Sequence, residues 1–300
     1  MNRREFVALA AATPLAAMSK SNLSVKLGID LFSLRSQKWT PFQYLDYCAA
    51  RGVQVVHFSE IRFLGSLDPG NLRKVREHAG KLGLQVEIGM KSICPSSKMF
   101  DPSQGTAEQQ LTRMIDAAKV IGSPIVRAVL GSADDRKPGP IEAHIEDTAQ
   151  VLRNVRSKAM GEGIKIAIET HGPYTATPER LQKVMELIDS PVLTINLDTG
   201  NSYLSENDPH EWLEQIVGQV THMHAKDISV QDARRLRGKV RGMLGCACGE
   251  GVIDWERIVT TLSKTDHDVV LSVECASLDA AQKSYAYLRH LIEQVQGDVD

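Results

Sequence analysis

Three carboxylates and one imidazole stand at the ends of four successive apolar segments of the chain. Glu169 closes the segment IAIE, Asp198 closes TINLD, His224 lies in THMHA, and Glu274 follows VVLSV. Each marks a point where a buried strand gives way to a loop. Parallel strands of a barrel end at one common face, so side chains in these positions can be directed at one central ion. The pattern predicts a metal-dependent reaction on a small polar substrate.

The four residues form an oxygen-rich set of metal ligands. Such a set suits Mn²⁺, Mg²⁺ or Co²⁺ better than a structural zinc site, which is richer in cysteine and histidine. Four protein ligands leave about two octahedral positions for substrate oxygens. We therefore expect one divalent ion, with Mn²⁺ as the first choice and Mg²⁺, Co²⁺ or Zn²⁺ as alternatives.

After residue 24 the chain repeats an order of apolar strand, polar loop, amphipathic helix and glycine. The expected strands are 25–32, 53–59, 84–90, 124–130, 164–170, 192–198, 220–226 and 268–275. The expected helices are 41–50, 70–82, 107–121, 141–161, 178–189, 209–218, 254–263 and 278–295. Eight such units predict a single (β/α)8 TIM barrel rather than an open doubly wound sheet. No Gly-x-Gly-x-x-Gly motif follows the first strand, which removes the usual dinucleotide fingerprint.

Signals for the ends of helices support this division. Thr40 and Asp208 each precede a proline, which places a capping side chain before the first helical turn. Gly122 and Gly163 stand where a left-handed residue would turn a helix into the following strand. The longest irregular stretch, 228–250, is rich in Arg and Gly and is a candidate cover for the active site.

The first twenty residues differ from the rest of the chain. Arg3, Arg4 and Phe6 precede an Ala-rich apolar run over residues 7–18, which is too short to span a bilayer. This pattern resembles a twin-arginine export signal. We therefore expect a cleaved signal over residues 1–20, a barrel domain over 21–300 and a periplasmic location; an ordinary first helix is the alternative.

The composition and net charge of the chain indicate which kinds of binding partner to expect. The 300-residue chain is 42% hydrophobic and 24% charged, with a formal net charge of −2. This balance gives no electrostatic reason to expect nucleic acid or stable membrane insertion, and it leaves homo-oligomerisation open. The five cysteines lack metal-ligand spacing: Cys48 and Cys275 fit core positions, and Cys246 and Cys248 fit a loop of small residues.

Four segments, IAIETHG, LDTGN, HMHAKD and GEGVIDW, resemble the sugar phosphate isomerase/epimerase group of xylose-isomerase-like barrels. The resemblance extends from about residue 25 to the end of the chain. It implies that Glu169, Asp198, His224 and Glu274 bind a divalent ion, often manganese. It also implies that Glu169 and Glu274 are the acid/base pair that moves a carbon-bound proton through an enediolate. The substrate would be a keto sugar or a related small carbohydrate.

One residue departs from the pattern of this group. Its ketose 3-epimerases carry His three positions after the sixth-strand Asp, where this chain has Asn201. Asn can bind a substrate hydroxyl but cannot carry a proton at neutral pH. A 3-keto-glycoside lyase or hydratase, which would use the same metal site for elimination, is therefore the alternative function. The export signal favours it, because glycosides are available outside the cytoplasm.

Other polar residues near strand ends are candidates for substrate binding. Lys91 and Arg127 end the third and fourth strands, where an unpaired cation inside a barrel mouth would be costly. His57, His171 and Lys226 could bind substrate or could orient the ligands around the ion.

Two more positions have mainly structural interpretations. His222 shares a face with His224 but lies one layer deeper, as a core histidine would, and Glu250 belongs to a turn before the helix cap Asp254.

Two further functions stay open. A metal-dependent apurinic endonuclease shares the barrel but needs a His-rich trinuclear zinc site, and Gly89, Met90 and Lys91 supply no histidine at the third strand end. An exported sugar-binding protein without turnover would not need the pair Glu169 and Glu274.

Overall fold

The computed structural model describes residues 25–132, 135, 141–239 and 245–297. The predicted export signal over residues 1–20 lies outside this range. No helix among the described residues is both long enough and apolar enough to cross a membrane.

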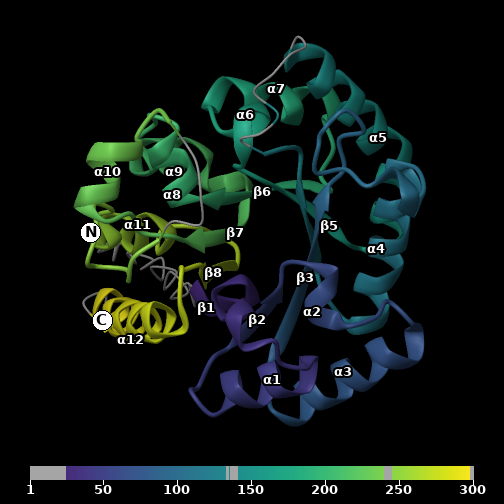
Figure 1. Cartoon of the computed structure of the whole chain (residues 1–300). Helices are drawn as coiled ribbons and strands as arrows, with labels where there is room; N and C mark the ends of the chain where they lie inside the picture. The colour runs from purple at the N-terminus through teal and green to yellow at the C-terminus, as the bar shows by residue number, and fades with distance from the viewer. Residues whose placement is uncertain (1–24, 133–134, 136–140, 240–244, 298–300) are drawn as a thin grey trace, which may run out of the picture.

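Eight parallel strands close into one barrel in the order of the chain, so that β8 pairs with β1 (Figure 1). The predicted fold class is therefore confirmed, and each expected strand contains one observed strand or overlaps most of it. The strands are β1 Val25–Asp30, β2 Val55–Phe58, β3 Gln85–Ser92, β4 Ile125–Val129, β5 Lys165–Glu169, β6 Leu193–Asp198, β7 Val220–Ala225 and β8 Val269–Val273.

Helices surround the barrel in the positions that the sequence predicts. The long ones are α1 Pro41–Ala49, α3 Pro69–Lys81, α4 Ala107–Ile121, α5 Ile141–Glu162, α7 Pro178–Ile188, α9 Pro209–Ile216, α11 Trp255–Leu262 and α12 Leu278–Gly297. Figure 1 shows them as an outer layer around the strands. Local chemistry fixes their ends: Asp208 accepts backbone N–H bonds from His210 and Glu211, and Gly122 closes α4 with a φ of 84°.

Short helices were not predicted. They follow strand ends at α2 Ile61–Leu64, α6 Gly172–Thr175, α8 Thr199–Leu204 and α10 Val230–Leu236. The stretch 228–250 was predicted to be irregular, and this prediction was wrong for its first part, because α10 covers Val230–Leu236. Ser229 caps α10 by accepting the N–H of Asp232, a local signal that the Arg-rich composition obscured. The Asp-capped start of α8 was likewise missed.

The barrel wall separates two environments. Met223 of β7 faces outward into the apolar core between strands and helices, whereas His222 and His224 on either side of it point into the barrel. A barrel interior is usually filled by branched apolar side chains. Here much of it is filled by buried polar groups: Asp30, His57, Glu87, Arg127, Glu169, Asn196, Asp198, His222, His224, Ser272 and Glu274. This departure locates the candidate site.

A buried carboxylate holds the loop that follows α10. Asp227 accepts hydrogen bonds from the backbone N–H groups of Ile228, Gly249, Gly251 and Ile253 and from the indole of Trp255. Gly251 is required there, since an added Cβ would lie 2.1 Å from Oδ1 of Asp227. This carboxylate therefore ties the end of β7 to the start of α11.

Replacing Asp227 by Asn should lower the free energy of unfolding by about 2–4 kcal/mol, because an amide NH₂ would face donors that it cannot satisfy. Chemical denaturation measures the change. Asp254→Asn is the matched control, since Asn caps α11 as well as Asp does. Equal stability of Asp227→Asn and the control would contradict this assignment.

Candidate metal centre and active site

The four predicted metal ligands meet at the carboxyl ends of β5 to β8. Glu169 and Asp198 end β5 and β6, His224 lies on β7, and Glu274 directly follows β8. One donor atom from each lies within 4.8 Å of the others, and all four residues are buried. Nδ1 of His224 is 2.8 Å from Glu274 Oε2, 3.6 Å from Glu169 Oε1 and 3.9 Å from Asp198 Oδ2.

This geometry fits a divalent cation. Nδ1 of His224 has no hydrogen-bond partner among the described residues, although three carboxylates lie around it. Buried carboxylates repel one another unless a positive charge lies between them. Three oxygens and one nitrogen are donors that a hard or borderline divalent ion accepts. Glu169, Asp198, His224 and Glu274 would hold such an ion.

Two buried cations lie against the same carboxylates. Arg127, on β4, contacts a carboxylate oxygen of Glu169 and donates to the carbonyl oxygen of Met90 at 3.2 Å. Nζ of Lys226 lies 2.7 Å from Glu274 Oε1 and 3.3 Å from Asp198 Oδ2. Each glutamate of the predicted acid/base pair thus has its own fixed positive charge.

These contacts change the pKa values of the three acids in different directions. Burial raises the pKa of Glu169, but Arg127 and then His224 outweigh burial and leave this pKa well below its usual range. For Glu274, Lys226 and His224 outweigh burial in the same way and hold the pKa at about 2. For Asp198, burial dominates and raises the pKa to about 7. Both glutamates are therefore ionised at neutral pH.

Two further predicted residues lie beside the cluster. The side-chain amide of Asn201 donates to Thr170 O at 3.1 Å and lies 3.5 Å from Glu169 Oε1, while its oxygen is 3.3 Å from Lys226 Nζ. His171 is half-buried, and its Nδ1 is 2.6 Å from the carbonyl oxygen of Gly131. Asn201 is thus placed to contact a substrate, and His171 is oriented by the loop after β4.

Two of the predicted polar residues, His57 and Lys91, differ in their access to solvent. His57 is fully buried inside the barrel, where it faces Asp30 and His224, so it cannot meet a substrate directly. Lys91 stands near the end of β3, where its side chain is 62% exposed and its Nζ lies 3.8 Å from Glu60 Oε2.

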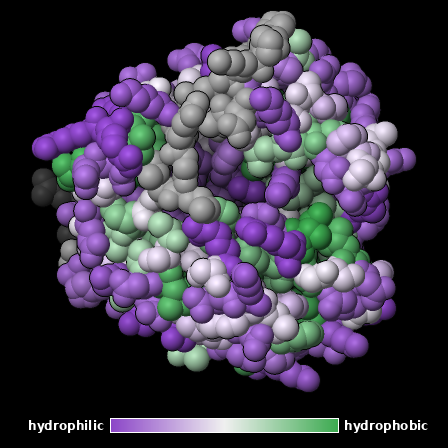
Figure 2. All heavy atoms as spheres, viewed as in Figure 1, coloured by the Kyte–Doolittle hydropathy of each residue, from purple (hydrophilic) through white to green (hydrophobic). Residues whose placement is uncertain are grey.

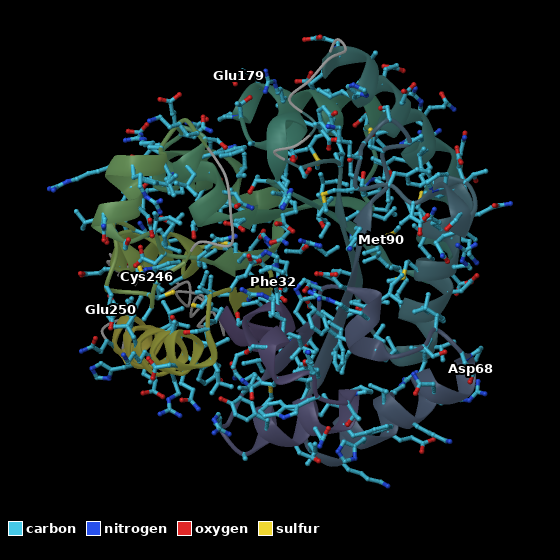
Figure 3. The ribbon with its side chains drawn as sticks, viewed as in Figure 1. Phe32, Asp68, Met90, Glu179, Cys246 and Glu250 are labelled. Atoms are coloured by element: carbon cyan, nitrogen blue, oxygen red, sulfur yellow. The ribbon has the colours of Figure 1, made fainter. Side chains whose placement is uncertain are left out.

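Two interpretations of the sequence agree with the structure. His222 is a deep core residue held by Glu87 at 2.5 Å. Glu250 is exposed and lies at the periphery of the view, away from the centre of the barrel (Figure 3).

Asp30 was not predicted from the sequence. It ends β1 as Asp198 ends β6, and its Oδ2 lies 3.1 Å from Nε2 of His224. The segment VKLGID carries the same signal as the four predicted segments, an acid at the end of an apolar strand. Glu87 was missed for a different reason, because it lies in the middle of its strand.

The mouth of the barrel is open to a substrate. Figure 2 shows a hollow near the centre of this face with hydrophilic side chains around it. Phe32 lies close to this centre in Figure 3, directly beyond β1, and the guanidinium of Arg35 covers its ring at 4.1 Å. Lys226, which is 12% exposed, brings a charged group to the edge of the metal ligands.

Metal affinity should depend on pH in a defined direction. Because the pKa of Asp198 is raised to about 7, a divalent ion must displace a proton from this acid at lower pH. The carboxylates of Glu169 and Glu274 also outweigh burial and raise the pKa of His224 well above its usual value, so this ligand must lose a proton too. Affinity for Mn²⁺ should therefore fall as the pH falls, by about tenfold per pH unit just above pH 7 and by about a hundredfold per unit below it. Calorimetric titration of metal-free protein in two buffers of different ionisation enthalpy measures both affinity and proton release. Equal affinity at pH 6 and pH 8, without proton release, would rule the mechanism out.

Solved structures with the same architecture include sugar epimerases. L-ribulose 3-epimerase matches with a TM-score of 0.72 and 18% identity, covering 92% of this chain and 97% of the other. The IolI protein with a binding zinc atom matches with a TM-score of 0.66 and 16% identity, covering 91% and 97%. At these identities the likeness concerns the fold.

Sequence relatives are more similar. The 3-oxo-isoapionate decarboxylase of Pectobacterium atrosepticum is 28% identical over 230 residues, which are 77% of this chain and 75% of the relative. An inosose dehydratase of Clostridium botulinum is 28% identical over 231 residues, covering 70% and 76%. The profile of the xylose isomerase-like TIM barrel family matches residues 44–291. This match spans most of the barrel and includes all four candidate metal ligands, and the chain belongs to the xylose isomerase-like TIM barrel family.

Proposed function

We propose that this protein is a divalent-metal-dependent isomerase or epimerase that acts on a keto sugar or a related carbohydrate. The observation that carries the proposal is the placement of Glu169 and Glu274 around one imidazole nitrogen, at 3.6 and 2.8 Å. Mn²⁺ is the proposed ion. When bound, the ion would supply positive charge that stabilises the oxyanion of an enediolate.

The two glutamates are proposed to move the proton. Each is ionised at neutral pH and can accept a proton from a carbon next to the substrate carbonyl. Arg127 and Lys226 make both carboxylates weak bases, so the substrate proton must first be acidified by the charge of the site. Lys226 and Asn201 would bind substrate hydroxyls at the mouth, where they already contact each other at 3.3 Å.

Glu274→Gln should reduce turnover by about 10²–10⁴-fold, because the amide cannot accept the proton. The assay incubates Mn²⁺-loaded protein with a panel of ketoses in deuterated water and follows carbon-bound exchange by NMR. Glu250→Gln is the matched control, since Glu250 is exposed and distant from the cluster. Lack of exchange across the panel with wild-type protein would contradict the proposal.

A second candidate uses the same first step and then expels a leaving group. Two observations favour such a lyase: Asn201 offers no titratable group to return a proton, and the relatives named above include a decarboxylase and a dehydratase. Loss of CO₂ from a 3-oxo acid forms an enolate, loss of water beside a ketone passes through an enolate and ends in an unsaturated ketone, and isomerisation passes through an enediolate. An export signal over residues 1–20 would bring the enzyme to glycosides, and a 3-keto-glycoside is then the proposed substrate.

Aglycone release separates the two candidates. A lyase should release the aglycone from 3-keto-glucosides and leave ordinary glucosides intact, because only the keto group acidifies the neighbouring carbon. Chromatography of the products measures this release. If 3-keto-glucosides show deuterium exchange without aglycone release, the isomerase or epimerase assignment holds and the lyase assignment fails.

A further inference from the structure

A second group of donor atoms lies inside the barrel, below the metal ligands. Asp30 Oδ2 is 3.1 Å from His224 Nε2 and 3.3 Å from His57 Nδ1, and these two nitrogens are 3.3 Å apart. The three atoms form a nearly equilateral triangle. Donors around a tetrahedral ion with bonds of about 2.0 Å are separated by about 3.3 Å. The triangle therefore has the dimensions of one face of a zinc site.

Hydrogen bonding leaves one corner of this triangle unsatisfied, although the two imidazole nitrogens contact each other and His224 Nε2 also lies 3.3 Å from Asn196 Nδ2. Asp30 Oδ2 accepts no hydrogen bond of acceptable geometry among the described residues, although two imidazole nitrogens are within 3.3 Å. The other oxygen of the same carboxylate is fully used by the hydroxyl of Ser59 and the N–H of Phe32. Asp30 and His57 are both 0% exposed, so solvent does not satisfy Oδ2.

His222 offers a fourth donor. Its Nδ1 is held by Glu87 at 2.5 Å, while its Nε2 has no hydrogen-bond partner among the described residues. The imidazoles of His57, His222 and His224 can each direct a nitrogen to within 4.8 Å of the others. Histidines that bind metal ions commonly donate one ring N–H to a carboxylate and bind the ion with the other ring nitrogen.

Negative charge inside the barrel favours cations beside both groups of donor atoms. Among the buried residues described, five carboxylates (Asp30, Glu87, Glu169, Asp198 and Glu274) face the interior, against two fixed cations (Arg127 and Lys226). Buried carboxylates are costly unless positive charge lies beside them, and a protonated His224 or a bound metal ion can supply that charge.

We propose that Asp30, His57, His222 and His224 form a second metal site that takes a nitrogen-preferring ion of the zinc class. His224 bridges the two sites, with Nδ1 toward the carboxylate-rich site and Nε2 toward the second one. Binding at Nε2 displaces its proton to solvent. Three imidazoles and one carboxylate distinguish the second site from the first, whose donors are mainly oxygens.

Zinc content tests the proposal without any substrate. Wild-type protein is purified from zinc-supplemented cells, dialysed against metal-free buffer and measured by mass spectrometry. It should hold two zinc ions per chain, one in each site. His57→Gln should hold one, because it leaves all four ligands of the first site in place. His78→Gln is the matched control, since His78 lies on α3 and pairs with Asp46, and it should hold two.

A crystal of the unmutated protein gives a result that does not depend on folding of a variant. An anomalous map at the zinc edge should show one peak among Glu169, Asp198 and Glu274 and another between Asp30 and His57. A single peak among the carboxylates, or the same zinc content in His57→Gln as in wild type, overturns the proposal. Asp30 would then act only as a polar neighbour of His224. Neither result bears on which sugar the enzyme uses.

Discussion

Repulsion between buried carboxylates is the constraint on which the active end of this barrel depends. Glu169, Asp198 and Glu274 converge within ion-pairing distance of one imidazole, in a place where water cannot screen them. Arg127 and Lys226 neutralise part of this charge, and a divalent cation would complete the compensation. The excess of negative charge that would destabilise an ordinary barrel core makes this core a candidate site for such a cation.

The geometry of the strands places these side chains at one site. Alternate residues of β7 point inward, so His222 and His224 are stacked in successive layers, and the register pairs His224 with Asp198 on one side and with Ser272 on the other. Asp227, two residues beyond β7, then fixes the loop that leads to α11. At the end of β7, a candidate ligand (His224), a neutralising cation (Lys226) and the loop anchor (Asp227) thus lie within four residues of the chain.

The sequence predicted the barrel and the four candidate metal ligands. An apolar strand that ends in an acid or an imidazole can be recognised from neighbouring residues alone. Asp30 carries the same signal and could have been found. The environment of Lys91 could not be predicted, since the register of β3 shifts between Gly89 and Ser92 and no residue type announces that shift. A carboxylate partner for Arg127 was one of two alternatives that the sequence left open, and the folded structure identifies this partner as Glu169.

Thermal unfolding of the wild-type protein with and without Mn²⁺ tests most directly whether the strand-end residues share a cation. An ion that binds only the folded state at 100 times its Kd adds about 2.7 kcal/mol of stability. The account predicts that chelator-treated protein melts at a lower temperature and that Mn²⁺ restores the melting temperature in a concentration-dependent way. An identical melting temperature in chelator and in millimolar Mn²⁺ would contradict it.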